Sequence, residues 1–113
     1  MMLPQVLADT RSGDRASFRL RVPAALEHFA GHFPGFPILP GIVQLDWAVR
    51  LARRHFEGLD ESYGIDNFKC QALVHPEAEL TLELRRDAGG LHFKYLERGR
   101  VCSSGKVLFG ARP

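Results

Sequence analysis

Residues 32–46 read HFPGFPILPGIVQLD, and this stretch separates a proline-rich segment from a largely apolar one. Its three prolines each fix φ and remove a backbone donor, so the part before Pro40 cannot be helix interior or central strand. Pro40 suits the first turn of a helix, and Gly41 lets backbone or ligand approach closely. The stretch therefore predicts a stiff loop that carries His32, followed by a helix that begins at Gly41.

The segment Gly41–Glu57 is predicted to form the only long helix, with Gly58 in the position that often follows a helix end. Apolar residues cover most of its circumference, which is typical of a buried helix. They form one stripe of Ile42, Leu45, Val49, Ala52 and Phe56 and a second group of Val43, Trp47, Ala48 and Leu51.

Apolar and polar residues alternate on both sides of this helix, which predicts strands. A short apolar segment, Leu3–Ala8, and a half-buried strand, Ala16–Val22, precede it. Four further strands, predicted as a meander, follow it at 63–75, 79–86, 91–97 and 101–109. We therefore predict an α+β fold, with residues 1–113 forming a single domain in which an antiparallel sheet wraps around one central helix.

Composition and charge exclude several classes of function. A formal net charge of +2 is too small to indicate nucleic-acid binding, and no apolar stretch is long enough to cross a bilayer. The first residues lack the features of a secretory signal, so a cytoplasmic location is expected. Cys70 and Cys102 share no metal-type spacing and are expected to be free thiols.

The proline-rich stretch also carries a resemblance to a known family. HFPGFPILPG, with an acid five residues after its last glycine, resembles the signature of the β-hydroxyacyl-ACP dehydratases of the hotdog fold, the FabA and FabZ types. PGIVQLDWA is more similar to the small dehydratase-like proteins of aryl polyene gene clusters, and FKCQALVHPEAEL resembles a strand of the family. The resemblance implies a dimeric hotdog enzyme that converts 3-hydroxyacyl-ACP to trans-2-enoyl-ACP in a fatty acid or aryl polyene type pathway.

The resemblance also implies roles for particular residues. His32 corresponds to the family's base, Asp46 to its acid or water-positioning group, and the backbone N–H of Gly41 to its donor for the substrate carbonyl. His32 and Asp46 are implied to meet across a dimer interface. Physical chemistry supports the role of Gly41, because an N–H at a helix start has no intrahelical partner and the helix dipole favours negative charge there.

An apolar tunnel for the acyl chain and an acidic carrier protein as partner are further implications. The candidate tunnel residues are Phe33, Phe36, Val43 and Trp47. A helix with sheet on one side is expected to leave Phe36, Val43 and Trp47 uncovered within one chain, and a second subunit could cover them. The substrate would arrive on the phosphopantetheine of an acyl carrier protein, and no metal or redox cofactor is implied. An acidic carrier is expected to bind a basic rim around the site. On residue type alone, the candidates for this rim are Lys69, Arg98, Arg100 and Lys106.

Alternatives remain open for these residues and for the function. Asp46 could form an ordinary ion pair with Arg50, where many dehydratases carry glutamine, and His32 could be a structural loop histidine. A zinc pair of His28 and His32 is not expected, because Gly31 and Pro34 break the helix that this spacing requires. The chain, expected as a homodimer, could instead be a non-catalytic or partner-dependent hotdog subunit that binds acyl-ACP or completes a heterodimer with an active relative. A hotdog thioesterase is a further alternative.

Overall fold

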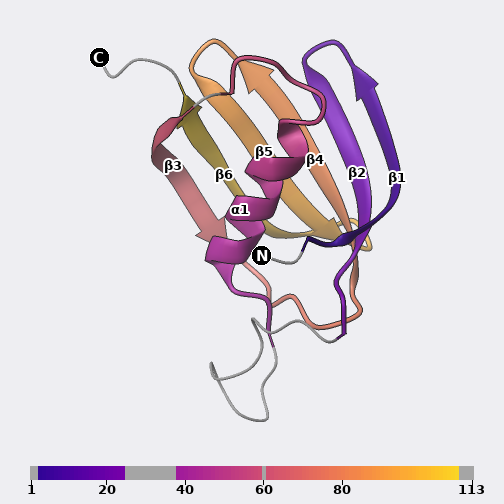
Figure 1. Cartoon of the computed structure of the whole chain (residues 1–113). Helices are drawn as coiled ribbons and strands as arrows, with labels where there is room; N and C mark the ends of the chain where they lie inside the picture. Colours follow the sequence, from indigo (N-terminus) through magenta and orange to yellow (C-terminus); the bar gives the residue numbers. More distant parts are fainter. Residues whose placement is uncertain (1–2, 25–37, 60, 110–113) are drawn as a thin grey trace.

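The computed structural model describes residues 3–24, 38–59 and 61–109. Within them, six strands form one antiparallel sheet in the order β1-β2-β4-β5-β6-β3, and α1 lies across one face of that sheet (Figure 1). The elements are β1 (Gln5–Ser12), β2 (Arg15–Arg21), α1 (Gly41–Ala52), β3 (Ser62–Cys70), β4 (Glu79–Asp87), β5 (Gly90–Glu97) and β6 (Arg100–Phe109). The predicted α+β class, with a sheet around one helix, is confirmed.

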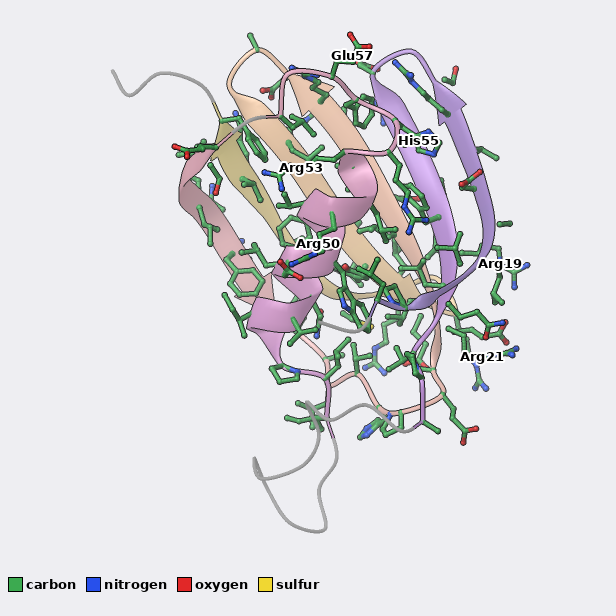
Figure 2. The ribbon with its side chains drawn as sticks, viewed as in Figure 1. Arg19, Arg21, Arg50, Arg53, His55 and Glu57 are labelled. Carbon is green, nitrogen blue, oxygen red and sulfur yellow. The ribbon has the colours of Figure 1, made fainter. Side chains whose placement is uncertain are left out.

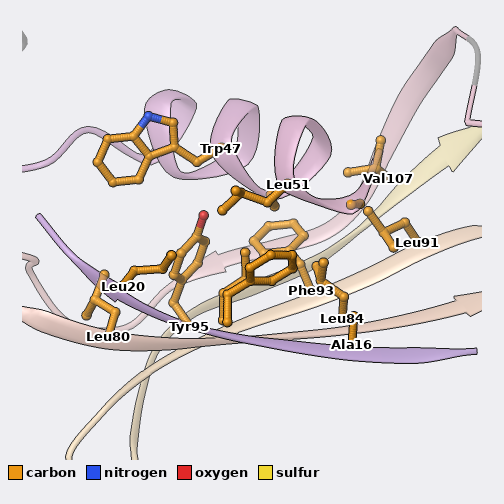
Figure 3. Packing of buried hydrophobic residues seen from close by; sticks show 14 of the residues in the cluster. Ala16, Leu20, Trp47, Leu51, Leu80, Leu84, Leu91, Phe93, Tyr95 and Val107 are labelled. Carbon is orange, nitrogen blue, oxygen red and sulfur yellow. The ribbon is translucent and has the colours of Figure 1, made fainter. Parts of the chain in front are cut away.

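The core lies between α1 and the inward face of the sheet (Figure 3). Alternate residues of β2 point into it, and Ala16, Phe18 and Leu20 are all buried, as their alternation predicts. The other strands add inward side chains in the same register, for example Leu82 opposite Tyr95. The two-residue period of the strands therefore accounts for most of the core.

The predicted four-stranded meander is wrong at β3. This strand pairs with β6 at the edge of the sheet, and only β4, β5 and β6 form a meander. It also ends at Cys70, before the predicted end at His75, because the N–H groups of Gln71 and Ala72 both turn to the carbonyl of Cys102. The following residues leave the edge of the sheet and reach the end of β2, where Glu77 N–H donates to the carbonyl of Val22, the residue after that strand.

The helix ends at Ala52, earlier than the predicted Glu57. The N–H of His55 donates to the carbonyl of Ala52, three residues back, so the chain tightens into a turn beyond the helix. Gly58 has a φ of +75°, as a helix-terminating glycine often does, but it lies beyond this turn. Apolar periodicity predicted too long a helix, because Phe56 is buried although it lies beyond the helix end.

One side of α1 faces the sheet, and the other side is only partly covered by the described residues. Val43 and Trp47 are 4% and 0% exposed, so the prediction that they lack cover within one chain is wrong. Ile42 is 68% exposed, and Leu45 and Val49 are only partly buried. The open side of α1 is therefore formed by Ile42, Leu45 and Val49, which belong to the first predicted apolar stripe.

The edge strand β3 is irregular and partly apolar. Its pairing with β6 shifts register between Asp66 and Lys69, and Asn67 within this bulge has a φ of 52°. Ile65 is opposite the buried Val107, which places it on the inward face of the sheet, yet it is 46% exposed. The inward face of β3 thus extends beyond the cover that α1 provides.

A polar cluster on the outer face of the sheet closes the hairpin of β4 and β5. The carboxylate of Asp87 accepts hydrogen bonds from the N–H groups of Gly89 and Gly90, and its Oδ2 lies 2.6 Å from His92 Nε2 and 3.4 Å from Lys106 Nζ. The hydrogen bonds from His92 and the Gly89 N–H hold the pKa of Asp87 well below its usual range.

Replacing Asp87 with Asn should make stability less dependent on pH in acid. A carboxylate whose folded pKa is lowered stabilises the fold above its unfolded pKa of about 3.9, and this contribution is lost as the pH falls towards the folded value. We expect Asp87→Asn to unfold at a lower temperature than the wild type at pH 7. The difference in unfolding temperature between the variant and the wild type should become smaller below about pH 4. Thermal unfolding followed by circular dichroism measures it, and Asp14→Asn in the exposed β1–β2 turn is the control. A difference that does not change with pH would contradict the prediction.

Candidate active site

The first turn of α1 presents backbone N–H groups without a side-chain cap. Pro40 occupies the N-cap position with extended backbone angles, φ −61° and ψ 147°. Its carbonyl accepts hydrogen bonds from the N–H groups of Val43 and Gln44. In the described part of the chain no group accepts from the N–H of Gly41. An N–H in the first turn of a helix has no partner within the helix, so the Gly41 N–H is a candidate donor for an oxygen that carries negative charge.

Close packing explains why residue 41 is glycine. A Cβ at this position would lie 3.0 Å from Phe68 Cζ and 3.1 Å from Cys70 Sγ, both on β3. Phe68 also lies near Phe93, with ring centroids 6.0 Å apart. The start of the helix thus lies directly against the end of the edge strand, and a larger residue would push the two apart.

Asp46 lies on the open side of α1 and pairs with Arg50. Arg50 Nε donates to Asp46 Oδ2 at 2.8 Å, and the carboxylate side chain is 31% exposed. Figure 2 shows Arg50 on α1. The predicted ion pair four residues apart is confirmed. At about 1.5 Å per residue, Asp46 lies about 7.5 Å along the helix axis from Gly41.

A buried polar network, which sequence reasoning missed, joins α1 to the sheet. Gln44 is 3% exposed; Tyr95 Oη donates to its carbonyl at 2.6 Å, and Ser103 Oγ donates to its Oε1 at 2.7 Å. Burial, with a smaller effect from the charge of Asp46, raises the pKa of Tyr95 well above its ordinary value. The sequence did hold a signal for this network: Gln44 lies on the same helix face as the apolar residues Ala48 and Leu51, which indicates a buried amide that needs partners.

Several predicted site residues cannot be placed. His32, Phe33 and Phe36 lie outside the described residues, so their roles stay predictions. Val43 and Trp47 lie in the core, and their role in a tunnel also stays a prediction.

Both cysteines are free thiols, Cys70 exposed and Cys102 buried, as predicted. The described residues contain no group of three or more His, Cys, Asp or Glu side chains arranged to hold a metal ion.

The candidate basic rim divides between two parts of the molecule. Arg98 and Arg100 are exposed at the turn between β5 and β6, whereas Lys106 is engaged with Asp87 on the outer face. Hydrogen bonds from Ala72 to Cys102 and from Leu39 to Val74 place that turn at the same end of the sheet as the helix start. Only part of the expected rim therefore lies near Gly41.

Comparison with known proteins identifies the family. A family model described as ApeI-like, ApeI dehydratase, matches residues 8–106. The chain belongs to the ApeI-like dehydratase family. Among curated proteins, this ApeI-like chain is 30% identical over 121 residues to the 3-hydroxyacyl-(acyl-carrier-protein) dehydratase FabZ of Oenococcus oeni. That alignment covers 96% of the chain and 86% of the relative.

Solved structures agree with this assignment. The ApeI-like chain superposes with a TM-score of 0.89 and 27% identity on a chain of the dehydratase heterocomplex ApeI:P from Xenorhabdus doucetiae, covering 97% of this chain and 100% of that one. An uncharacterised protein from Erwinia carotovora subsp. atroseptica gives a TM-score of 0.84 and 33% identity, with coverages of 96% and 97%. The predicted hotdog fold is therefore confirmed. Across the described ranges, no helix has the length and apolar character needed to span a membrane.

Gly41→Ala should disturb the start of α1 without unfolding the protein. Its Cβ would press on Phe68 and Cys70, so the N–H of residue 41 must shift. We expect a loss of about 1–3 kcal/mol in the free energy of unfolding, measured by urea denaturation. The control is Gly89→Ala, whose Cβ would meet only the flexible end of Lys106 and the Asp87 carboxylate. Equal stabilities of the two variants would show that the start of the helix tolerates a side chain.

Proposed function

We propose that this chain dehydrates 3-hydroxyacyl thioesters carried on an acyl carrier protein to trans-2-enoyl thioesters. The family match and the FabZ relative support a hydroxyacyl dehydratase function. The observation that carries the proposal is the first-turn N–H of Gly41, for which the described residues supply no acceptor, on the same helix as the partly exposed carboxylate of Asp46. A donor at a helix start stabilises the negative charge that develops on a thioester carbonyl when a C2 proton is removed.

In this proposal three groups divide the reaction. His32 removes the proton at C2, and the N–H of Gly41 binds the carbonyl oxygen as it becomes enolate-like. The C3–O bond then breaks, and the hydroxyl leaves as water after receiving a proton. Asp46 uses Oδ1 to donate that proton or to position the departing water, because Oδ2 is held by Arg50. The elimination needs neither a metal nor a redox cofactor.

A second hotdog subunit completes the site in this proposal. Gly41 at the start of α1 packs against Phe68 of the edge strand. Ile42 on the open side of α1 and Ile65 and Phe68 on the edge strand are exposed apolar residues. Burying such a surface favours association, and a free sheet edge offers backbone groups for pairing. The similar ApeI:P structure is a heterocomplex, which favours a related partner as the alternative to a second copy.

The acyl carrier protein would approach the end of the sheet that holds the helix start. Arg98 and Arg100 are exposed at that end, and an acidic carrier is attracted to positive charge. The pathway would be of the fatty acid or aryl polyene type, as the ApeI-like family match suggests.

Turnover by the purified chain separates the proposal from its alternatives. We expect the protein alone to hydrate a trans-2-enoyl thioester on an acyl carrier protein, measured as loss of the absorbance of the conjugated double bond. Activity that requires an added hotdog partner would establish the partner-dependent subunit instead. Release of free thiol, detected with a disulfide-exchange dye, would indicate a thioesterase.

Two substitutions test the catalytic roles. His32→Ala should abolish turnover without changing the unfolding temperature. Asp46→Asn should lower kcat by about a hundredfold or more if the carboxyl group transfers a proton. The matched control is Asp14→Asn, which changes an exposed carboxylate in the β1–β2 turn. This variant should leave kcat unchanged. A small effect of Asp46→Asn, with a lower unfolding temperature, would reduce Asp46 to the ion-pair partner of Arg50.

Ile42→Lys tests whether the open side of α1 binds a subunit. Ile42 is 68% exposed, so a charge there should leave the isolated chain as stable as the wild type. In an interface, the same charge would be buried without a partner and should weaken association strongly. Sedimentation velocity would show dimers for the wild type, alone or with a hotdog partner, and monomers for the variant. Unchanged dimers of the variant would place the interface elsewhere.

A further inference from the structure

Gln44 is the buried polar residue through which three segments of the chain meet. Its Nε2 donates to the carbonyl of Leu39 at 3.1 Å, and its Oε1 accepts from Ser103 of β6. Its own carbonyl accepts from Tyr95 of β5, whose hydroxyl points towards the helix in Figure 3. A buried amide without partners is costly, so these hydrogen bonds must form together.

One of these hydrogen bonds reaches the turn that presents the N–H of Gly41. Leu39 lies two residues before Gly41, and its N–H donates to the carbonyl of Val74 at 2.7 Å. Between them, Pro40 has no N–H, and its side chain makes no capping hydrogen bond. The two hydrogen bonds of Leu39 therefore hold this turn from both sides, and Gln44 supplies the second.

The other two hydrogen bonds act on the body of the helix. Ser103 of β6 and Tyr95 of β5 attach Gln44 to the interior strands of the sheet, and their hydroxyl groups bond to Gln44 and not to the Leu39 peptide. The network therefore has two separable parts. One part anchors the helix to the sheet, and the other extends that anchor to the peptide before Gly41.

We infer that Gln44 is a positioning residue for the carbonyl donor. Its amide holds the Leu39 peptide, so the N–H of Gly41 keeps one direction when the substrate oxygen becomes negative. This inference rests on the proposed function. A preorganised donor stabilises a transition state more than a ground state, so the loss of Gln44 should affect kcat more than KM.

Gln44→Met and Ser103→Ala separate positioning from simple stability. Met keeps a similar length and volume but cannot donate to Leu39, whereas Ser103→Ala leaves that hydrogen bond in place. Both variants leave a buried polar atom unpaired, so both should unfold at a lower temperature. We expect Gln44→Met to lower kcat by at least about tenfold with KM within about twofold, and Ser103→Ala to keep kcat within about threefold of the wild type. Equal losses of kcat in the two variants would overturn the inference.

Amide hydrogen exchange gives a readout that does not need turnover. The N–H groups of Leu39 and Val43, followed by NMR, should exchange faster in Gln44→Met than in Ser103→Ala, measured relative to amides of β4. Equal exchange in both variants would overturn the inference even if the wild type is active. If the wild type shows no turnover, the proposed function fails, and faster exchange confined to Gln44→Met would still support the structural role.

Gln44→Glu provides a second test if Gln44→Met does not fold. A protonated glutamic acid can donate to the carbonyl of Leu39, and burial favours the protonated form. The ratio of its kcat to that of the wild type should therefore rise as the pH falls. A ratio that stays constant with pH would contradict the positioning role.

Discussion

The hydrogen bonds of the Gln44 amide and carbonyl set the position of α1, and the candidate site depends on that position. Apolar packing by residues such as Trp47 and Leu51 holds the helix against the sheet but is tolerant of small sliding movements. Directed hydrogen bonds from Tyr95 and Ser103 remove that freedom. The same groups that specify how the helix packs therefore specify where its first turn presents a backbone donor.

Much of the fold could be predicted because its physical causes are local. The alternation in β2 and in the β4–β5 hairpin identified buried faces correctly, and Pro40 with Gly41 located the helix start. The pairing of β3 with β6 could not be predicted, because local patterns do not specify which strands meet. The helix end was misplaced for a related reason: Phe56 continues the apolar period but reaches the core from a turn.

The candidate site was only partly predictable. Gly41 and the pair of Asp46 with Arg50 followed from position and spacing along one helix. The role of Gln44 depends on two residues more than fifty positions away, Tyr95 and Ser103, and no spacing rule connects them. The open side of α1 was assigned to the wrong residues, because apolar residues occur both where the helix meets the sheet and where it remains uncovered.

The bulge in β3 has a consequence for what can join this edge of the sheet. A regular strand accepts neighbours in many alignments, which invites mispairing and fibril growth. Between Asp66 and Lys69 the ladder shifts, and Asn67 takes a left-handed backbone conformation, so the strand bends there. A bend of this kind hinders the addition of a regular strand along the whole of β3, which protects this edge from uncontrolled pairing.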